Sequence, residues 1–287
     1  MAALNAFAGV RAACATDPAV EELEIALLLE ALFQRHGYDF RDYDRHQVRR
    51  KLLAVVRERA LNTVSALQER VLHEPGAASH LLRALAVAPA TLFDSPECAG
   101  QARIALGASL RPAAVPKVWL AECASVGEAW SLAILLAEED LLARTEIFAT
   151  LANDELLAEV REASIDAAEL PGLQQNYERS GGSGRLSDYF ELRDGRARLL
   201  PRLRARITWA QYNLVTDASF NEFQAIVCRR ALADFGPVLR QRVLRLFHDS
   251  LARFGVLGID RELAPGDAHA ADYLPIFGHL AWYKRVG

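Results

Sequence analysis

One stretch of the sequence has the residue order of a cofactor-binding turn. Residues 118–140 read as an apolar strand, a short loop of small residues and an amphipathic helix. In turns of this kind, glycine lets the backbone approach a ligand closely and adopt a positive φ. Glu122 and Val126 stand where such turns usually carry glycine. The segment therefore indicates a cofactor turn whose ligand contacts have changed.

A second candidate site is a basic segment nearer the N-terminus. Residues 45–59 hold six basic side chains against one acid, Glu58, which gives a local charge of +5. A helix here would place positions 45, 49 and 52 on one side and positions 50 and 57 one heptad apart. The interpretations are a solvated face, a surface for an acidic protein, or capture of a phosphate or other anionic ligand. We do not expect RNA binding, because no aromatic residues are interleaved with the arginines. The basic residues are Arg45, Arg49, Arg50, Lys51, Arg57 and Arg59.

Composition limits the classes of protein to consider. The chain has 287 residues, of which 52% are hydrophobic and 24% charged, and its net charge is −4. These values predict a soluble globular protein with no DNA partner, no membrane insertion and a cytoplasmic location. The four cysteines are far apart, so we expect neither a disulfide framework nor a metal site. We expect Cys123 and Cys228 to be small buried side chains in a reducing compartment.

The elements that must position these residues fall into two parts. Residues 1–90 predict a helical N-terminal domain, with one helix starting at Asp17-Pro18 and ending near Gly37. We expect residues 91–116 to be a linker. Residues 117–287 alternate short apolar runs with helical stretches, which predicts a mainly parallel sheet covered by helices. The segment 166–205 interrupts this order, and its Asp194-Gly195 pair predicts a small β-hairpin.

Several long segments, in this order, resemble the CheR-type methyltransferases. These enzymes transfer a methyl group from S-adenosylmethionine to glutamates of chemotaxis receptors. The resemblance covers the chain from about residue 25 to its end, and it implies an α/β, Rossmann-like methyltransferase domain with a small antiparallel β insertion, preceded by an all-helical domain. The matching segments are GYDFRDY, LFDSPE, VWLAECASVGEAWSLAILL, IFATLANDELL, SDYFELRDGRARL, YNLVTDASFNEFQAIVCRRALADF and LFHDSLARFGVLGI.

The cofactor positions that the resemblance implies are only partly kept. The first loop begins at Ala121, and its two family glycines are replaced by Glu122 and Val126. At an effective dielectric near 20, a glutamate about 4 Å from the methionine carboxylate would repel it by roughly 4 kcal/mol. Leu151 replaces the aspartate that binds the ribose hydroxyls in the family, which removes an acceptor for charge-assisted hydrogen bonds.

Three further positions could keep part of the cofactor contact. Asn153 keeps an amide near the ribose position, and Asn213-Leu214 matches the family's Asn-Leu pair at the adenine end.

The catalytic positions that the resemblance implies are also changed. The family has threonine and arginine where this chain has Ala90 and Asp94, and asparagine and tyrosine where it has Arg230 and Asp234. One hypothesis is that Glu122, Asp94, Asp234 and Arg230 form an internal salt-bridge network. The other is that each side chain points to solvent.

The leading hypothesis is a CheR-like protein that no longer methylates and acts as a binding or regulatory module in bacterial signalling. It implies no cofactor and a protein partner with an acidic surface, similar to a receptor or a sensor kinase. The first alternative is an active protein-glutamate O-methyltransferase using S-adenosylmethionine and releasing S-adenosylhomocysteine, and the weaker one is a binder of another anionic ligand. We expect His269 and His279 to be surface or satisfied histidines, and the four tryptophans to pack in the core.

Overall fold

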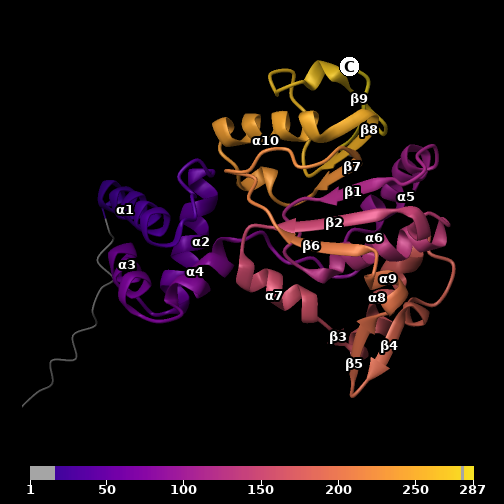
Figure 1. Cartoon of the computed structure of the whole chain (residues 1–287). Coiled ribbons are helices and arrows are strands. Elements are labelled where there is room, and N and C mark those ends of the chain that lie inside the picture. The colour runs from indigo at the N-terminus through magenta and orange to yellow at the C-terminus, as the bar shows by residue number, and fades with distance from the viewer. Residues whose placement is uncertain (1–16, 279–280) are drawn as a thin grey trace, which may run out of the picture. The chain divides into compact units, whose positions relative to one another are not determined.

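The computed structural model describes residues 17–278 and 281–287, and it divides into two compact units (Figure 1). One unit is helical and ends at Leu85. The other begins at Ala86, continues to Gly287, and includes the short segment 42–44. In the described part of the chain, none of the helices is both long enough and apolar enough to span a bilayer.

The helical unit contains the helices that the sequence predicts. Asp17 caps the first of them by accepting a hydrogen bond from the Ala19 amide at 2.9 Å, and Gly37 ends it with φ of 77°. Its core is made of fully buried leucines such as Leu28 and Leu52. The four helices are α1 (Pro18–His36), α2 (Arg45–Glu58), α3 (Val64–His73) and α4 (Ala77–Leu85).

The second unit is built on a seven-stranded sheet in the order β6-β2-β1-β7-β8-β10-β9. The first five of these strands pair in parallel, whereas β10 runs antiparallel to both β8 and β9. The predicted parallel sheet is therefore confirmed. The strands are β1 (Lys117–Leu120), β2 (Glu146–Leu151), β6 (Ile207–Gln211), β7 (Phe223–Cys228), β8 (Leu251–Ile259), β9 (Tyr273–Pro275) and β10 (Trp282–Arg285).

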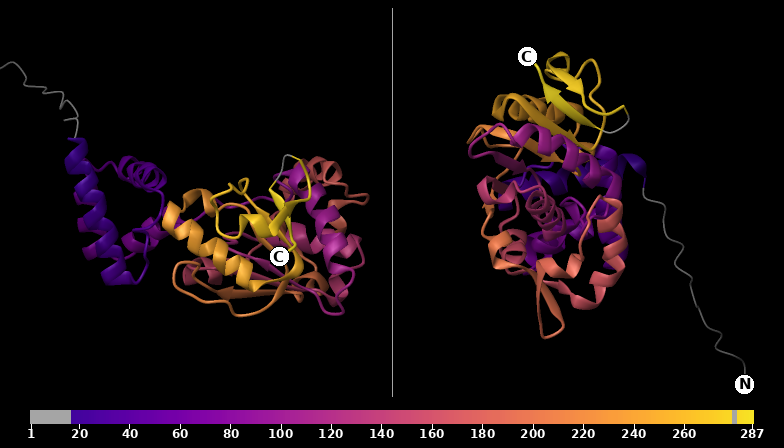
Figure 2. Two further views of the ribbon diagram at one scale, coloured as in Figure 1. Left: turned by 90° about the horizontal axis from the view of Figure 1, so that it is seen from above. Right: turned by 90° about the vertical axis from the view of Figure 1, so that its right-hand side faces the viewer.

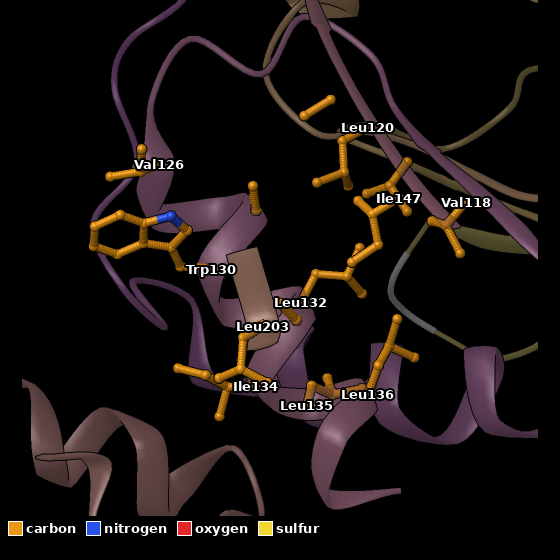
Figure 3. Close-up of a cluster of buried hydrophobic side chains, with 14 of the residues drawn as sticks. Val118, Leu120, Val126, Trp130, Leu132, Ile134, Leu135, Leu136, Ile147 and Leu203 are labelled. Atoms are coloured by element: carbon orange, nitrogen blue, oxygen red, sulfur yellow. The ribbon is translucent and has the colours of Figure 1, made fainter. Parts of the chain in front are cut away.

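Helices cover both faces of this sheet (Figure 2). Alternate residues of β1 point to opposite faces, so Val118 and Leu120 pack with α5 and α6, whereas Trp119 packs with α10. Figure 3 shows Val118 and Leu120 in the first cluster together with Val126 and Trp130. The helices are α5 (Pro96–Leu110), α6 (Val126–Glu138), α7 (Asp154–Glu162) and α10 (Pro237–Ser250).

The expected linker at residues 91–116 is wrong, because most of it forms α5. Leu106 and Leu110 of α5 are fully buried in the cluster on one face of the sheet. The helix is made largely of alanine, glycine and small polar residues, so its sequence shows little amphipathic periodicity. The boundary between the two units accordingly lies at residues 85–86 rather than near residue 90.

The insertion expected at residues 166–205 forms a separate three-stranded antiparallel sheet in the order β3-β5-β4. The hairpin predicted at Asp194-Gly195 is confirmed, since these two residues join β4 to β5 with φ of 50° and 72°. Positive φ at both positions is typical of the tightest hairpin turns. The elements are β3 (Ile165–Asp166), α8 (Leu170–Arg179), β4 (Phe190–Arg193), β5 (Arg196–Leu199) and α9 (Pro201–Arg204).

Candidate functional site

The loop between β1 and α6 is fixed by the strands on either side of it. The Ala121 amide donates to the Val227 carbonyl at 2.9 Å, and the Cys123 amide donates to the Thr150 carbonyl at 2.8 Å. Glu122 has φ of 54°, which is the left-handed conformation that glycine adopts most easily. The backbone at Glu122 therefore keeps the shape of a glycine turn although the residue carries a side chain.

Val126 behaves differently from what the sequence indicates. It is the first residue of α6, it is absent from the positive-φ positions of the described chain, and its side chain is buried in the core. Although Val126 stands where such turns usually carry glycine, it needs no positive φ, because α6 begins there and helical φ suits any L-residue.

Gly127 marks a close contact between α6 and the segment that precedes α5. A Cβ atom at this position would lie 2.2 Å from the Ala90 carbonyl oxygen and 2.6 Å from the Thr91 carbonyl carbon. The Ser125 hydroxyl accepts from the Ala90 amide at 2.8 Å and donates to the Ala90 carbonyl at 2.9 Å. Ser131 Oγ accepts from the Phe93 amide at 2.9 Å. These contacts hold residues 90–93 against the start of α6.

A pocket of about 230 Å³ opens beside this contact. It lies where the strand order reverses, between the ends of β1 and β7, which is the usual ligand position in open parallel sheets. Apolar side chains of α5 and α6 line it together with Trp282, and charged side chains also contribute to its lining. The lining includes Ala90, Asp94, Cys98, Leu106, Leu120, Glu128, Ser131, Leu132, Val227, Arg229, Arg230 and Trp282.

One ion pair and one hydrogen bond organise the charged side chains of the pocket. Arg230 forms an ion pair with Asp94, and the two side chains are 31% and 33% exposed. Arg229 lies beside them and donates to the Cys98 sulfur at 2.7 Å. The part of the proposed network that joins Asp94 to Arg230 is therefore present, and both residues line one pocket together with Ala90.

Two partly buried carboxyl groups lie at the start of α6. Burial raises the pKa of Glu122 to about 8. Burial also raises the pKa of Glu128 to about 7, although the nearby Arg230 and Arg229 act to lower it. Because Glu128 lines the pocket, this site can hold or release a proton near neutral pH.

The expected ribose positions are occupied by structural contacts. Leu151 ends β2 and is buried in the apolar cluster on the face covered by α5 and α6. The side-chain oxygen of Asn153 caps α7 by accepting from the Leu156 amide at 3.0 Å. Neither residue lines the pocket.

The remaining predicted positions lie in turns outside the pocket lining. Asn213 accepts from the Val215 amide at 2.9 Å in a tight turn, and Leu214 is buried. Asp234 ends a short 3-10 turn, where its carbonyl accepts from the Asp44 amide at 2.8 Å. Asp234 therefore lies outside the lining of the pocket that Arg230 and Asp94 share.

Sequence reasoning did not find Arg229 and Cys98 as pocket residues. Arg229 directly follows β7, and side chains that follow a parallel strand tend to reach the ligand-binding edge of the sheet. The position of Arg229 at the end of a predicted strand could therefore have identified it as a pocket residue. No such feature of the sequence pointed to Cys98, because α5 was not predicted. The structure confirms that Cys123 and Cys228 are buried free thiols.

The basic residues of α2 are less available than their number indicates. Arg45 pairs with Glu22 at 2.6 Å, and Arg49 pairs with Glu21 at 2.5 Å. Lys51 donates to the Leu85 carbonyl at 3.0 Å. The local charge of +5 was counted from residues 45–59 alone. Two acidic side chains of α1, Glu21 and Glu22, pair with these arginines and reduce the charge that is available. Arg50 and Arg57 are exposed, and Arg59 is partly exposed.

Comparison with known proteins identifies the family. Residues 102–263 match the family model described as the CheR methyltransferase S-adenosylmethionine-binding domain, and residues 23–86 match the CheR all-alpha domain. The putative methyltransferase Cher3 of Pseudomonas putida is 37% identical over 236 residues, covering 82% of this chain and 86% of that protein. The chain belongs to the CheR methyltransferase family. The resemblance seen in the sequence is thus confirmed.

Other relatives match a shorter part of the chain. A chemotaxis protein methyltransferase of Listeria innocua is 29% identical over 154 residues, which is 53% of this chain and 56% of that protein. The match to the solved structure of an O-methyltransferase family protein from Burkholderia thailandensis covers 83% of this chain and 52% of that protein. The two sequences are 14% identical there, and the TM-score is 0.35. CheR methyltransferases depend on S-adenosylmethionine, so the pocket must be compared with that cofactor.

Proposed function

We propose that this CheR-family chain has lost methyl transfer to glutamate and acts as a binding module in bacterial signalling. The ion pair between Asp94 and Arg230 carries the proposal. The resemblance places an arginine and an asparagine at these two positions, where a free guanidinium would serve the reaction. In this chain the guanidinium belongs to Arg230, at the family's asparagine position, and it is already paired with the carboxylate of Asp94. A paired charge has less capacity to bind a new ligand.

The residues around the turn do not fit S-adenosylmethionine well. Leu151 offers no acceptor for the ribose hydroxyls, and the Asn153 oxygen already accepts a backbone hydrogen bond. We therefore expect no resident cofactor and derive no reaction step through one.

A second candidate is an active S-adenosylmethionine-dependent protein-glutamate O-methyltransferase. The positive φ of Glu122 favours it, because the backbone there keeps the conformation of the family's glycine although the glycine is replaced. Burial raises the pKa of Glu122 to about 8, so a neutral carboxyl group would not repel the methionine carboxylate at pH 7. Binding of a different anionic ligand is a weaker candidate, supported by Arg229 in the pocket lining.

Isothermal titration calorimetry of the whole chain separates these candidates. With S-adenosylmethionine or S-adenosylhomocysteine at up to about 100 μM, we expect no saturable heat, since micromolar binding requires about 8 kcal/mol of contacts. The Leu151→Asp variant is the matched comparison, because it restores one charged acceptor worth about 1.5–3 kcal/mol. Micromolar binding by the unmodified chain, or methyl transfer to a receptor helix, would contradict the proposal.

We infer that the partner is a protein with an acidic surface, of receptor or sensor-kinase type, which contacts α2 in the cytoplasm. Arg50 and Arg57 support this inference because they are exposed and lie two helical turns apart. Their guanidinium groups suit bidentate pairing with carboxylates on a partner helix.

Charge reversal tests this surface. In a pull-down, Arg50→Glu with Arg57→Glu is expected to weaken capture of the partner at least tenfold, because two attractive contacts become repulsive. Arg193→Glu is the control, since Arg193 is an exposed arginine on the β4–β5 hairpin. Equal capture by all three proteins would rule out α2 as the binding surface.

A further inference from the structure

Three ligand-type side chains meet near the C-terminus, in a cluster separate from the pocket. His248 lies late in α10, whereas His269 and Asp272 belong to the segment before β9. His269 Nδ1 is 3.0 Å from Asp272 Oδ2, and His248 Nε2 is 3.9 Å from the same oxygen. One ligand atom from each residue lies within 4.8 Å of the other two. We propose that this cluster binds one divalent transition-metal ion of the zinc type.

The donor set suits such an ion. Imidazole nitrogen and carboxylate oxygen are the ligands with which proteins hold Zn²⁺, Ni²⁺ and Co²⁺, and three protein ligands leave a position for water. Neutral imidazole is the form of histidine that binds such ions.

His248 also has an unmet polar interaction. The residue is 7% exposed, and its Nδ1 atom is buried without a hydrogen-bond partner among the described residues. Its Nε2 atom is 3.9 Å from the Asp272 carboxylate, which is beyond hydrogen-bonding distance. A metal ion beside Asp272 would bind Nε2, the ring nitrogen nearer this carboxylate, and would leave Nδ1 as it is.

One ring must turn for both histidines to ligate the same ion. The two imidazoles are stacked, with ring centroids 3.8 Å apart and planes 7° apart, so a single ion cannot lie in both ring planes. The His248 side chain is 10% exposed, whereas that of His269 is 35% exposed on a loop residue with φ of 57°. His269 is therefore the ligand that rotates, and it exchanges its contact with Asp272 for a shared contact with the metal.

The surrounding charges allow a cation at this place. Arg285 is the nearby positive group, and it donates to the backbone carbonyls of His248 and Leu251. Asp272 and Asp249 act on His248 with the opposite sign. Charges of both signs therefore surround the cluster, and Asp272 supplies a negative charge beside the ion.

Metal titration of the EDTA-treated, dialysed full chain tests the proposal. With ZnCl₂, we expect saturable binding of one ion and a rise in melting temperature, because the ion binds the folded state alone. With CoCl₂, visible d–d absorption bands would report imidazole and carboxylate ligation directly. His269→Ala should abolish both signals without unfolding the chain, since its side chain is partly exposed.

The control variant is His46→Ala, which removes an exposed histidine from α2. It should bind zinc and cobalt as the unmodified chain does. The proposal fails if the unmodified chain shows no saturable zinc binding. It also fails if His269→Ala binds as tightly as His46→Ala, since the ion would then occupy a different group of histidines.

Discussion

Replacing Gly127 by alanine is expected to lower the free energy of unfolding by about 3 kcal/mol. The added Cβ would lie 2.2 Å from the Ala90 carbonyl oxygen and 2.6 Å from the Thr91 carbonyl carbon. These are backbone atoms, and hydrogen bonds from Ser125 and Ser131 hold their segment in place. The segment therefore cannot move aside without loss of several contacts. Urea unfolding followed by circular dichroism measures the change.

Gly107→Ala is the matched control for this prediction. Gly107 lies inside α5, and a Cβ there would meet nothing within 4 Å. Alanine should stabilise that helix by up to about 1 kcal/mol, because glycine is the poorer helix former. If Gly127→Ala proved as stable as Gly107→Ala, the contact between α6 and residues 90–93 would not be as close as described.

Glu122→Gln is expected to change how stability depends on pH. Burial raises the pKa of Glu122 to about 8 in the folded chain, whereas its ordinary value is 4.5. Between these two values the folded state binds more protons than the unfolded state, so the unmodified chain loses stability as pH rises. Glutamine carries no charge and removes this loss. Relative to the unmodified chain, the variant should gain a few kcal/mol between pH 4 and pH 8.

The comparison of variant and unmodified chain isolates Glu122, because Glu128 titrates in both proteins. Thermal or urea unfolding at pH 4, 6 and 8 provides the measurement. Glu222→Gln serves as a control, since Glu222 is an exposed glutamate in the same unit. A constant difference in stability across this range would show that the Glu122 carboxyl group reaches solvent in the folded chain.

Elements with strong local signals could be predicted from the sequence. The apolar runs gave the central strands, and the Asp194-Gly195 pair marked its hairpin because few residues other than glycine tolerate positive φ. The predicted linker was wrong because α5 consists mainly of small residues, so a helix buried against the sheet has no visible stripe of large apolar side chains.

The candidate site was less predictable than the fold, because its contacts join distant segments. The pairing of Asp94 with Arg230 was one of two hypotheses, and only the packing of α5 against the end of β7 brings the two residues together. The acids that neutralise Arg45 and Arg49 come from another helix. His269 was predicted to be a surface or satisfied histidine, and no feature of the sequence indicated that the fold would stack it on His248 of α10. His279, for which a surface or satisfied position was also predicted, lies outside the described residues.

The order of the strands also governs when each part of the chain can fold. Val118 of β1 pairs with Ala225 of β7, so one edge of β1 stays open during synthesis until β7 has emerged. An unpaired central strand is a template for wrong pairing with another chain. The helices of the first unit contact segments that are near them in the sequence, so this unit can fold before β7 has been synthesised. The nascent chain therefore passes through a stage in which the helical unit is complete and the sheet of the second unit still has an exposed edge.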